Sequence, residues 1–259
     1  ADYATVADSA ARAALAPVDS LIAQGALQQA VAYTREVEAQ MPGSLLPALW
    51  RGSAYFLLGD RSTTAALDSA QAAFRTILGA APGFGPAHNG VAAVLKRRQF
   101  RALAAYDSLE AAIELTPVAA GAELHEVVTD LWFYPGERVA KMVSQQLGPA
   151  LAFLPFLRRQ GQRVFIPPLH RDLAAATGDA SFRSAATFDH RRWMDIRGVG
   201  GSRVAAAGIE YLERGSHLER GVLLHEFVHL VHASVLTEAQ RRRVRELYLA
   251  AMEEERTLD

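Results

Sequence analysis

One spacing recurs three times in the first half of the chain and limits how that half can fold. An alanine is followed 12 residues later by a proline, from Ala30 to Pro42, from Ala70 to Pro82 and from Ala105 to Pro117. A small residue lets two helices approach closely, and proline ends a helix because it lacks an N–H and its ring clashes with the preceding turn. The spacing therefore predicts a row of helix pairs, each of which buries its apolar face against the next pair.

Other positions repeat in phase with these pairs. Gly52 and Tyr55 fall in the first helix of the second pair, and Phe74 falls between its alanine and its proline. The prolines recur after 40 and then 35 residues, close to the ~34-residue period of a tetratricopeptide repeat. Residues 1–117 therefore resemble tetratricopeptide repeats, with an insertion near 61–67. Helical hairpins of no particular family remain the alternative.

This resemblance implies a concave groove that can bind a peptide segment of a protein partner or substrate. About two and a half repeat units are visible in the sequence. Because each unit buries its apolar face against a neighbour, the following domain is expected to cap the stack.

The pattern changes after residue 117. Apolar residues at helical spacing predict one helix within 120–135, ended by Pro135 and Gly136, and a second helix over 137–159. The fold class expected for the whole chain is mainly α. It comprises tetratricopeptide-like α-hairpin repeats over 1–117 and an α+β zincin-like domain over 118–259.

Short strand patterns supply the β part of that second domain. β-branched and aromatic residues predict one strand at 163–166 and another at 202–213, with Gly208 marking a bulge or a close backbone approach. Residues 171–202 show weak periodicity and are expected to be mostly loop.

Residues 216–235 hold the segment with the clearest chemistry. Ser216 and Glu219 fit a capping box that would begin a helix. Apolar residues then occupy nearly every face, which predicts a buried helix. Thr237 and Gln240 repeat the capping pattern and predict a second, more exposed helix that runs to about residue 255.

The first of these helices contains His225-Glu226-Phe227-Val228-His229. Residues i and i+4 differ by ~40° around a helix axis and by ~6 Å along it, so both imidazoles can reach one ion. Glu226 is rotated ~100° from His225, close enough to address a water on that ion. A buried helix with unpaired polar side chains is costly, which favours a metal site over core histidines that bond each other and the backbone.

The segment from about 202 to 232 resembles the zincin metallopeptidases, with a strand, a loop and then the His-Glu-x-x-His helix. The resemblance covers roughly the last 100 residues. It implies a Zn2+ ion held by His225 and His229, with Glu226 as the general base. It also implies that the strand before the helix is the sheet edge to which an extended peptide substrate adds. Metzincins are excluded, because residues 230–235 lack the glycine and the third histidine of that family.

The third zinc ligand is left open. In the gluzincins, which include relatives of the anthrax lethal factor peptidase domain, a glutamate on a later helix completes the site. We expect such a glutamate beyond residue 259, which would make the second domain truncated at its C-terminus. His232 lies ~10 Å along the axis from His225, which suits a place beside the site better than ligation. If the ligand is not beyond residue 259, it is expected to be one of Glu253, Glu254 and Glu255. The other acids that follow the motif are Glu238 and Glu246.

The amino-acid composition limits the metal ligands, the location and the kinds of partner that can be expected. The chain has no cysteine, so any metal must be held by histidine and carboxylates, and a secreted or periplasmic location is slightly favoured. The net charge is −1, and acids on the same helix offset Arg241, Arg242 and Arg243, which argues against a nucleic-acid partner. No apolar run approaches the ~20 residues needed to span a membrane.

The expected function is therefore that of a zinc endopeptidase with Glu226 as the base, whose repeats recruit a protein substrate. The alternative is a repeat-based protein-binding module with a catalytically inactive zincin scaffold. Tyr211 or Tyr248 could donate a hydrogen bond to an oxyanion, although the spacing brings neither to the metal. Asp189 and His190 are expected to be solvated loop residues.

Overall fold

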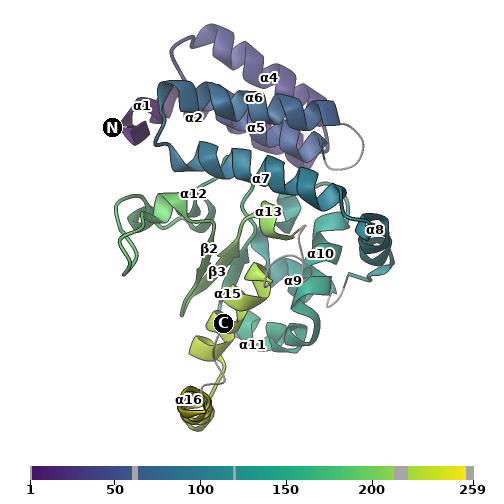
Figure 1. The fold of residues 1–259 in the computed structure, drawn as a ribbon, viewed down its shortest axis with the longest axis vertical. Coiled ribbons are helices and arrows are strands. Elements are labelled where there is room, and N and C mark those ends of the chain that lie inside the picture. The colour runs from purple at the N-terminus through teal and green to yellow at the C-terminus, as the bar shows by residue number, and fades with distance from the viewer. Residues whose placement is uncertain (1, 60–63, 119–120, 213–220, 255–259) are drawn as a thin grey trace.

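The computed structural model describes residues 2–59, 64–118, 121–212 and 221–254. The described chain is mainly helical with one small three-stranded sheet, which confirms the expected mainly α class. The first helices form layers at one end of the molecule, the sheet and helix α15 lie beneath them, and helix α16 projects at the opposite end (Figure 1).

The N-terminal part consists of helices that follow one another closely. Helices α3, α4, α5 and α6 each contact the next helix in the chain, so the helices from α3 to α7 pair in sequence order (Figure 1). Helices α4, α6 and α8 each end two residues before one of the recurring prolines. The helices of this part are α1 (Asp2–Val6), α2 (Ser9–Ala14), α3 (Ala16–Ala23), α4 (Leu27–Gln40), α5 (Leu46–Leu58), α6 (Thr64–Ala80), α7 (Gly85–Arg101) and α8 (Tyr106–Leu115).

Phe74 shows why small residues recur among these helices. Its ring, from α6, lies between Gly52 of α5 and Gly90 of α7. A Cβ atom built on Gly52 or Gly90 would lie 2.6 or 2.7 Å from a ring carbon of Phe74. Glycine at both positions lets the aromatic ring fill the space between two helices, as the sequence predicted for this kind of packing.

The segment after residue 117 differs from the two long helices that were expected. Val128 leaves the helix to form a β-bridge with Val164. Farther along, Pro149 and Pro155 each stand in the first turn of a new helix, where the missing N–H costs nothing. The segment is thus divided into α9 (Gly121–Val127), the 3-10 helix η1 (Thr129–Phe133), α10 (Arg138–Leu147), the 3-10 helix η2 (Gly148–Phe153) and α11 (Leu154–Arg159).

The sheet has the strand order β1-β3-β2. Strand β1 (Arg163–Phe165), which was expected, is parallel to β3 (Val204–Ala207), and β2 (Gly198–Gly200) is antiparallel to it. Helix α15 packs against β2 and β3. Because β3 is paired on both sides, β2 is one edge of the sheet and β1 is the other.

The second strand predicted in this region is shorter than expected, and the segment predicted to be mostly loop also holds short helices and a strand. The strand predicted over 202–213 ends at Ala207, and Ile209–Leu212 form helix α13. Residues 171–202, predicted to be mostly loop, contain strand β2 and three short helices. Strand β2 has the sequence Gly-Val-Gly, which carries no alternating apolar pattern, so only its pairing with β3 identifies it. The three helices are α12 (Leu173–Thr177), η3 (Ala180–Arg183) and η4 (Trp193–Asp195).

Buried His170 joins the first helices to the sheet region. Its Nε2 lies 2.8 Å from a carboxylate oxygen of Asp19 in α3, and its Nδ1 lies 3.0 Å from Oγ of Ser53 in α5. Its ring also packs on Trp50, with the ring centres 4.8 Å apart. The chain's own residues therefore cover part of the surface of α3 and α5.

The last two helices are α15 (Val222–Ser234) and α16 (Glu238–Glu253). The capping box of Thr237 and Gln240 is present as predicted, whereas the one expected at Ser216 and Glu219 lies outside the described residues. Helix α16 has no buried residue, and its arginines are paired in part, Arg241 with Glu238 and Arg243 with Glu246.

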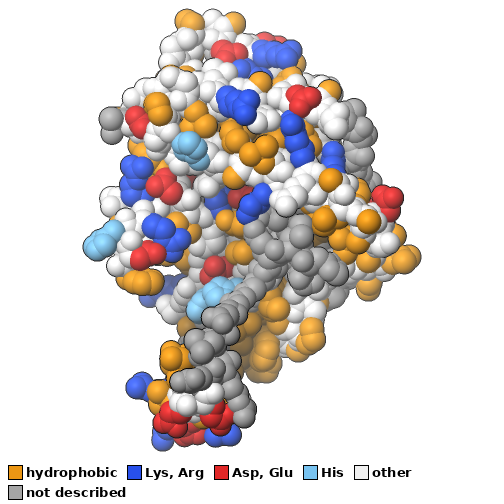
Figure 2. Space-filling model, viewed as in Figure 1, with side chains coloured by type: hydrophobic (Ala, Val, Ile, Leu, Met, Phe, Trp, Pro, Cys, Tyr) orange, Lys and Arg blue, Asp and Glu red, His pale blue; other side chains and the backbone are white. Residues whose placement is uncertain are grey.

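The face of the molecule shown in Figure 2 mixes acidic, basic and apolar side chains, and the projecting α16 does the same. None of the described helices is long and apolar enough to cross a bilayer.

Candidate metal centre

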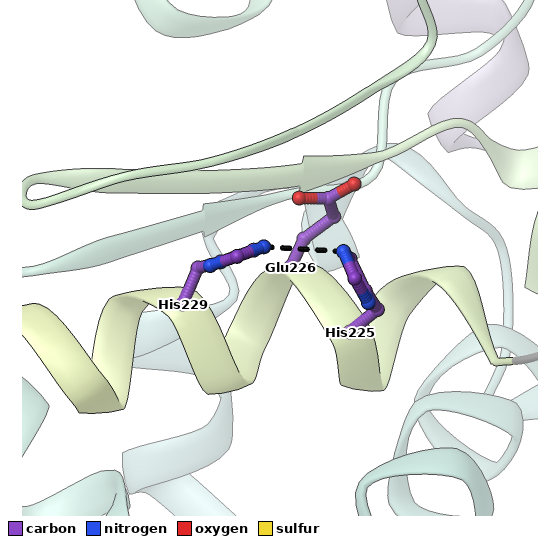
Figure 3. A group of neighbouring side chains, drawn as sticks. All are labelled: His225, Glu226 and His229. Atoms are coloured by element: carbon purple, nitrogen blue, oxygen red, sulfur yellow. Dashed lines mark hydrogen bonds between the residues drawn. The ribbon is translucent and has the colours of Figure 1, made fainter. Parts of the chain in front are cut away.

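Helix α15 brings His225, Glu226 and His229 together (Figure 3). One ligand atom from each of the three lies within 4.8 Å of the others, and the two Nε2 atoms are 3.1 Å apart. Two nitrogen ligands of a tetrahedral zinc ion, at ~2.0–2.1 Å from the metal, lie ~3.3–3.4 Å from each other. The two imidazoles are therefore spaced almost as one metal ion would need them.

The helix that carries these residues is not buried all round, contrary to the prediction. Leu223, Phe227 and Leu230 are buried against the rest of the fold, whereas His225 and His229 are exposed and Glu226 is half-buried. The sheet covers one side of α15, so apolar residues such as Val228, 50% exposed, remain on the other side. The case for a metal therefore rests on the spacing of the donor atoms and not on burial of the helix.

The pKa shifts of His229 and Glu226 bear on metal binding and on proton transfer. Burial, and then the neighbouring charges of His225 and His232, lower the pKa of His229, which favours the neutral ring that binds metals. Burial raises the pKa of Glu226, and the charge of His225 opposes that shift. A carboxyl group with a raised pKa can both take and return a proton nearer neutral pH.

Glu226 lies against the edge strand β2, and two glycines of that strand make this possible. A Cβ on Gly198 would lie 3.0 Å from one carboxylate oxygen of Glu226. A Cβ on Gly200 would lie 2.7 Å from the other oxygen, and 2.8 Å from both the backbone carbonyl oxygen of Glu226 and Cβ of His229. Sequence reasoning missed these glycines, although Gly198, Gly200 and Gly201 within four residues could have indicated a close backbone approach.

We expect Gly200→Ala to weaken zinc binding by about 10- to 100-fold, the range seen when groups that orient metal ligands are altered. The new methyl group meets backbone of α15, which cannot turn aside as a side chain could. Zinc affinity measured by competition with a chromophoric chelator checks this. Gly201→Ala is the matched control, because the nearest atom to its Cβ, the carbonyl oxygen of Val204, is 4.0 Å away. Equal zinc affinity of the two variants would contradict the positioning role of Gly200.

A cavity of about 670 Å3 opens beside the three residues. Glu226 and His229 line one wall, and Gly198–Gly200 of β2 line the next. Tyr211, from α13, and several residues of the segment 187–197 also line it. The tertiary structure thus brings Tyr211 to the site, whereas Tyr248 stands on the projecting α16 and is 57% exposed. His190, which was expected to be a solvated loop residue, also lines this cleft.

The third ligand is not supplied by the described residues. Among them, no other histidine, aspartate or glutamate lies close enough to form one ligand group with His225, Glu226 and His229. The acids Glu238, Glu246, Glu253 and Glu254 belong to α16 or its C-terminal cap, at the end of the molecule away from the N-terminal helices (Figure 1). Glu255, the remaining acid considered, lies outside the described residues.

Comparison of the chain with protein-family models, with curated proteins and with solved structures gave no match.

Proposed function

We propose that this protein is a zinc-dependent peptidase that uses His225 and His229 as metal ligands and Glu226 as the general base. The observation that carries the proposal is the 3.1 Å separation of the two Nε2 atoms, with a carboxylate oxygen of Glu226 within 4.8 Å of both. Among biological metals, zinc accepts imidazole and carboxylate ligands in a tetrahedral arrangement, so the donor set fits it.

Bound zinc would supply a Lewis acid that lowers the pKa of a coordinated water towards ~7 and polarises the substrate carbonyl. Glu226 takes the proton of the attacking water and returns it to the leaving amine, since its carboxylate adjoins both histidines. The phenol of Tyr211, in the same cleft, is the candidate donor to the oxygen on which negative charge develops.

The substrate is an extended peptide in this proposal, and strand β2 is where it would add. The strand before the helix, β3, was expected to be the edge, but it is paired with both β1 and β2. Edge strand β2 lines the cleft and adjoins Glu226. An extended peptide that pairs with an edge strand gains backbone hydrogen bonds regardless of its sequence.

The proposal keeps the two-part organisation, with tetratricopeptide-like repeats over 1–117 and a zincin-like domain over 118–259. Glycines on both sides of Phe74 and helices that end before each proline support the repeat assignment. Because His170 covers part of α3 and α5, recruitment of a protein substrate falls to surfaces of these helices that the chain leaves open.

A second function has one observation in its favour. The described residues offer two histidines and Glu226 and no further ligand, which is what an inactive zincin scaffold attached to a binding module would show. The two functions differ in whether the zinc-loaded protein hydrolyses peptides.

The direct test is hydrolysis of casein or of a peptide library by the protein loaded with one equivalent of zinc. The peptidase proposal expects turnover that a chelator abolishes and that added zinc restores, because the attacking water depends on the metal. Full zinc occupancy without any turnover would favour the scaffold.

A further inference from the structure

A second cavity lies between the first helices and the segment that precedes β2. Its volume is about 670 Å3, within the ~300–1,000 Å3 of pockets that hold small molecules. Four buried apolar side chains line it: Leu46, Leu49, Phe84 and Leu169. None of His225, Glu226 and His229 lines it, so it is separate from the metal centre.

Arginines from separate parts of the chain surround this apolar surface. Arg12 comes from α2, Arg171 precedes α12, and Arg183 ends η3. Among the described residues, no carboxylate forms an ion pair with Arg12 or Arg183, whereas the carboxylates of Asp19 and Asp130 attract Arg171 electrostatically. Arg12 lies over the ring of Trp50, at 5.5 Å, and Arg171 donates to the carbonyl oxygen of Ala175, at 2.9 Å.

The acids of the cavity do not balance these arginines. Five arginines and two aspartates line it, in a chain whose net charge is −1. Asp8 and Asp172 each accept a hydrogen bond from a backbone N–H at the start of a helix, at 2.9 and 2.6 Å. The other two arginines form ion pairs: Arg192 pairs with Asp195, and Arg197 pairs with Glu210. With these two pairs set aside, Arg12, Arg171 and Arg183 remain in the lining against Asp8 and Asp172, so the lining keeps a surplus of positive charge.

We propose that this cavity binds a small amphipathic anion, with its acidic head at Arg12, Arg171 and Arg183 and its apolar body on the leucines and Phe84. Guanidinium groups form paired, charge-assisted hydrogen bonds with carboxylates and phosphates alike. Burial of a hydrocarbon body on the apolar wall adds affinity in proportion to the area covered. The ligand is a small molecule because the cavity is a hollow of limited volume and not an extended groove.

The cavity adjoins the cleft of the metal centre. Arg192 and Arg197 line both spaces, and the segment between them includes η4 (Trp193–Asp195). Arg197 holds this segment in place, because its guanidinium donates to Glu210 and to the carbonyl oxygens of Pro167 and Arg171. A bound anion would therefore be separated from the proposed substrate only by the segment from Arg192 to Arg197.

The test uses calorimetric titration of the whole protein with octanoate and octyl phosphate, both below their micelle concentrations. We expect one ion per chain, bound at least about tenfold more tightly than octyl glucoside or octyltrimethylammonium, which carry the same tail without a negative charge. The tighter of the two anions identifies the headgroup. Equal binding of the anions and the two comparison compounds would overturn the proposal.

Variants locate the binding. The double variant Arg12→Gln/Arg183→Gln should weaken anion binding at least about tenfold, because it removes two exposed charges from the rim. Arg75→Gln, an exposed arginine of α6 outside the cavity, is the control and should bind as the unmodified protein does. Ala13→Trp adds bulk at an exposed lining position and should also reduce binding. Unchanged binding in both the double variant and Ala13→Trp would place the anion elsewhere and refute the assignment.

Discussion

Glu226→Gln is expected to lower the rate of peptide hydrolysis by ~10²–10⁴-fold, the usual contribution of a general base. Glutamine keeps the size and much of the hydrogen bonding of the side chain, so the close contact with Gly198 and Gly200 is preserved. It cannot take a proton from water. Zinc content should stay unchanged, because His225 and His229 are untouched.

The measurement is the turnover of a casein or peptide-library substrate, together with elemental analysis of zinc in the same samples. Glu238→Gln is the matched control, since Glu238 is an exposed carboxylate of α16 that pairs only with Arg241 among the described residues. Turnover by Glu226→Gln equal to that of the unmodified enzyme would show that another group is the base.

His229→Ala should remove both zinc and activity. The two Nε2 atoms stand 3.1 Å apart on one helix, and loss of either leaves a single imidazole, which cannot hold the ion as a pair does. We expect zinc affinity to fall by more than about 100-fold, beyond the ~10–100-fold that follows from changes to groups behind the ligands. Equilibrium dialysis against buffered zinc gives the affinity, and circular dichroism checks that the overall helix content is retained.

His232→Ala is the control that makes this result specific. His232 lies on the same helix and its charge affects the pKa of His229, but it is outside the ligand group. Its loss should leave zinc binding within about twofold of the original, as expected for an exposed residue that makes no bond to the metal. Loss of zinc in both variants would mean that the ligand assignment within α15 is wrong.

The sequence by itself determined what depends on residues close together in the chain. The 12-residue intervals from alanine to proline predicted where α4, α6 and α8 end, because a proline stops a helix wherever the helix packs. The four-residue separation of His225 and His229 predicted that the rings would meet, because helix geometry alone sets that distance. The capping box of Thr237 and Gln240 was predictable for the same reason.

Only the tertiary structure decided what depends on contacts between distant segments. Strand β2 exists because β3 pairs with it, and its glycines matter because Glu226 of α15 lies against them. The sequence predicted a buried α15, but the number of faces that neighbours cover is a property of the whole fold, and the sheet covers one side of it.

The cleft beside the metal ligands and the cavity lined by Arg12, Arg171 and Arg183 are both formed by segments that are distant in the sequence. Tyr211, from α13, lines the same cleft as Glu226 and His229, and Arg12 of α2 lines the same cavity as Arg183 of η3. The spacing of residues within one segment does not predict such contacts, since they are set by the packing of segments many residues apart. The chemistry of the metal ligands could therefore be predicted from the chain, whereas their surroundings required the fold.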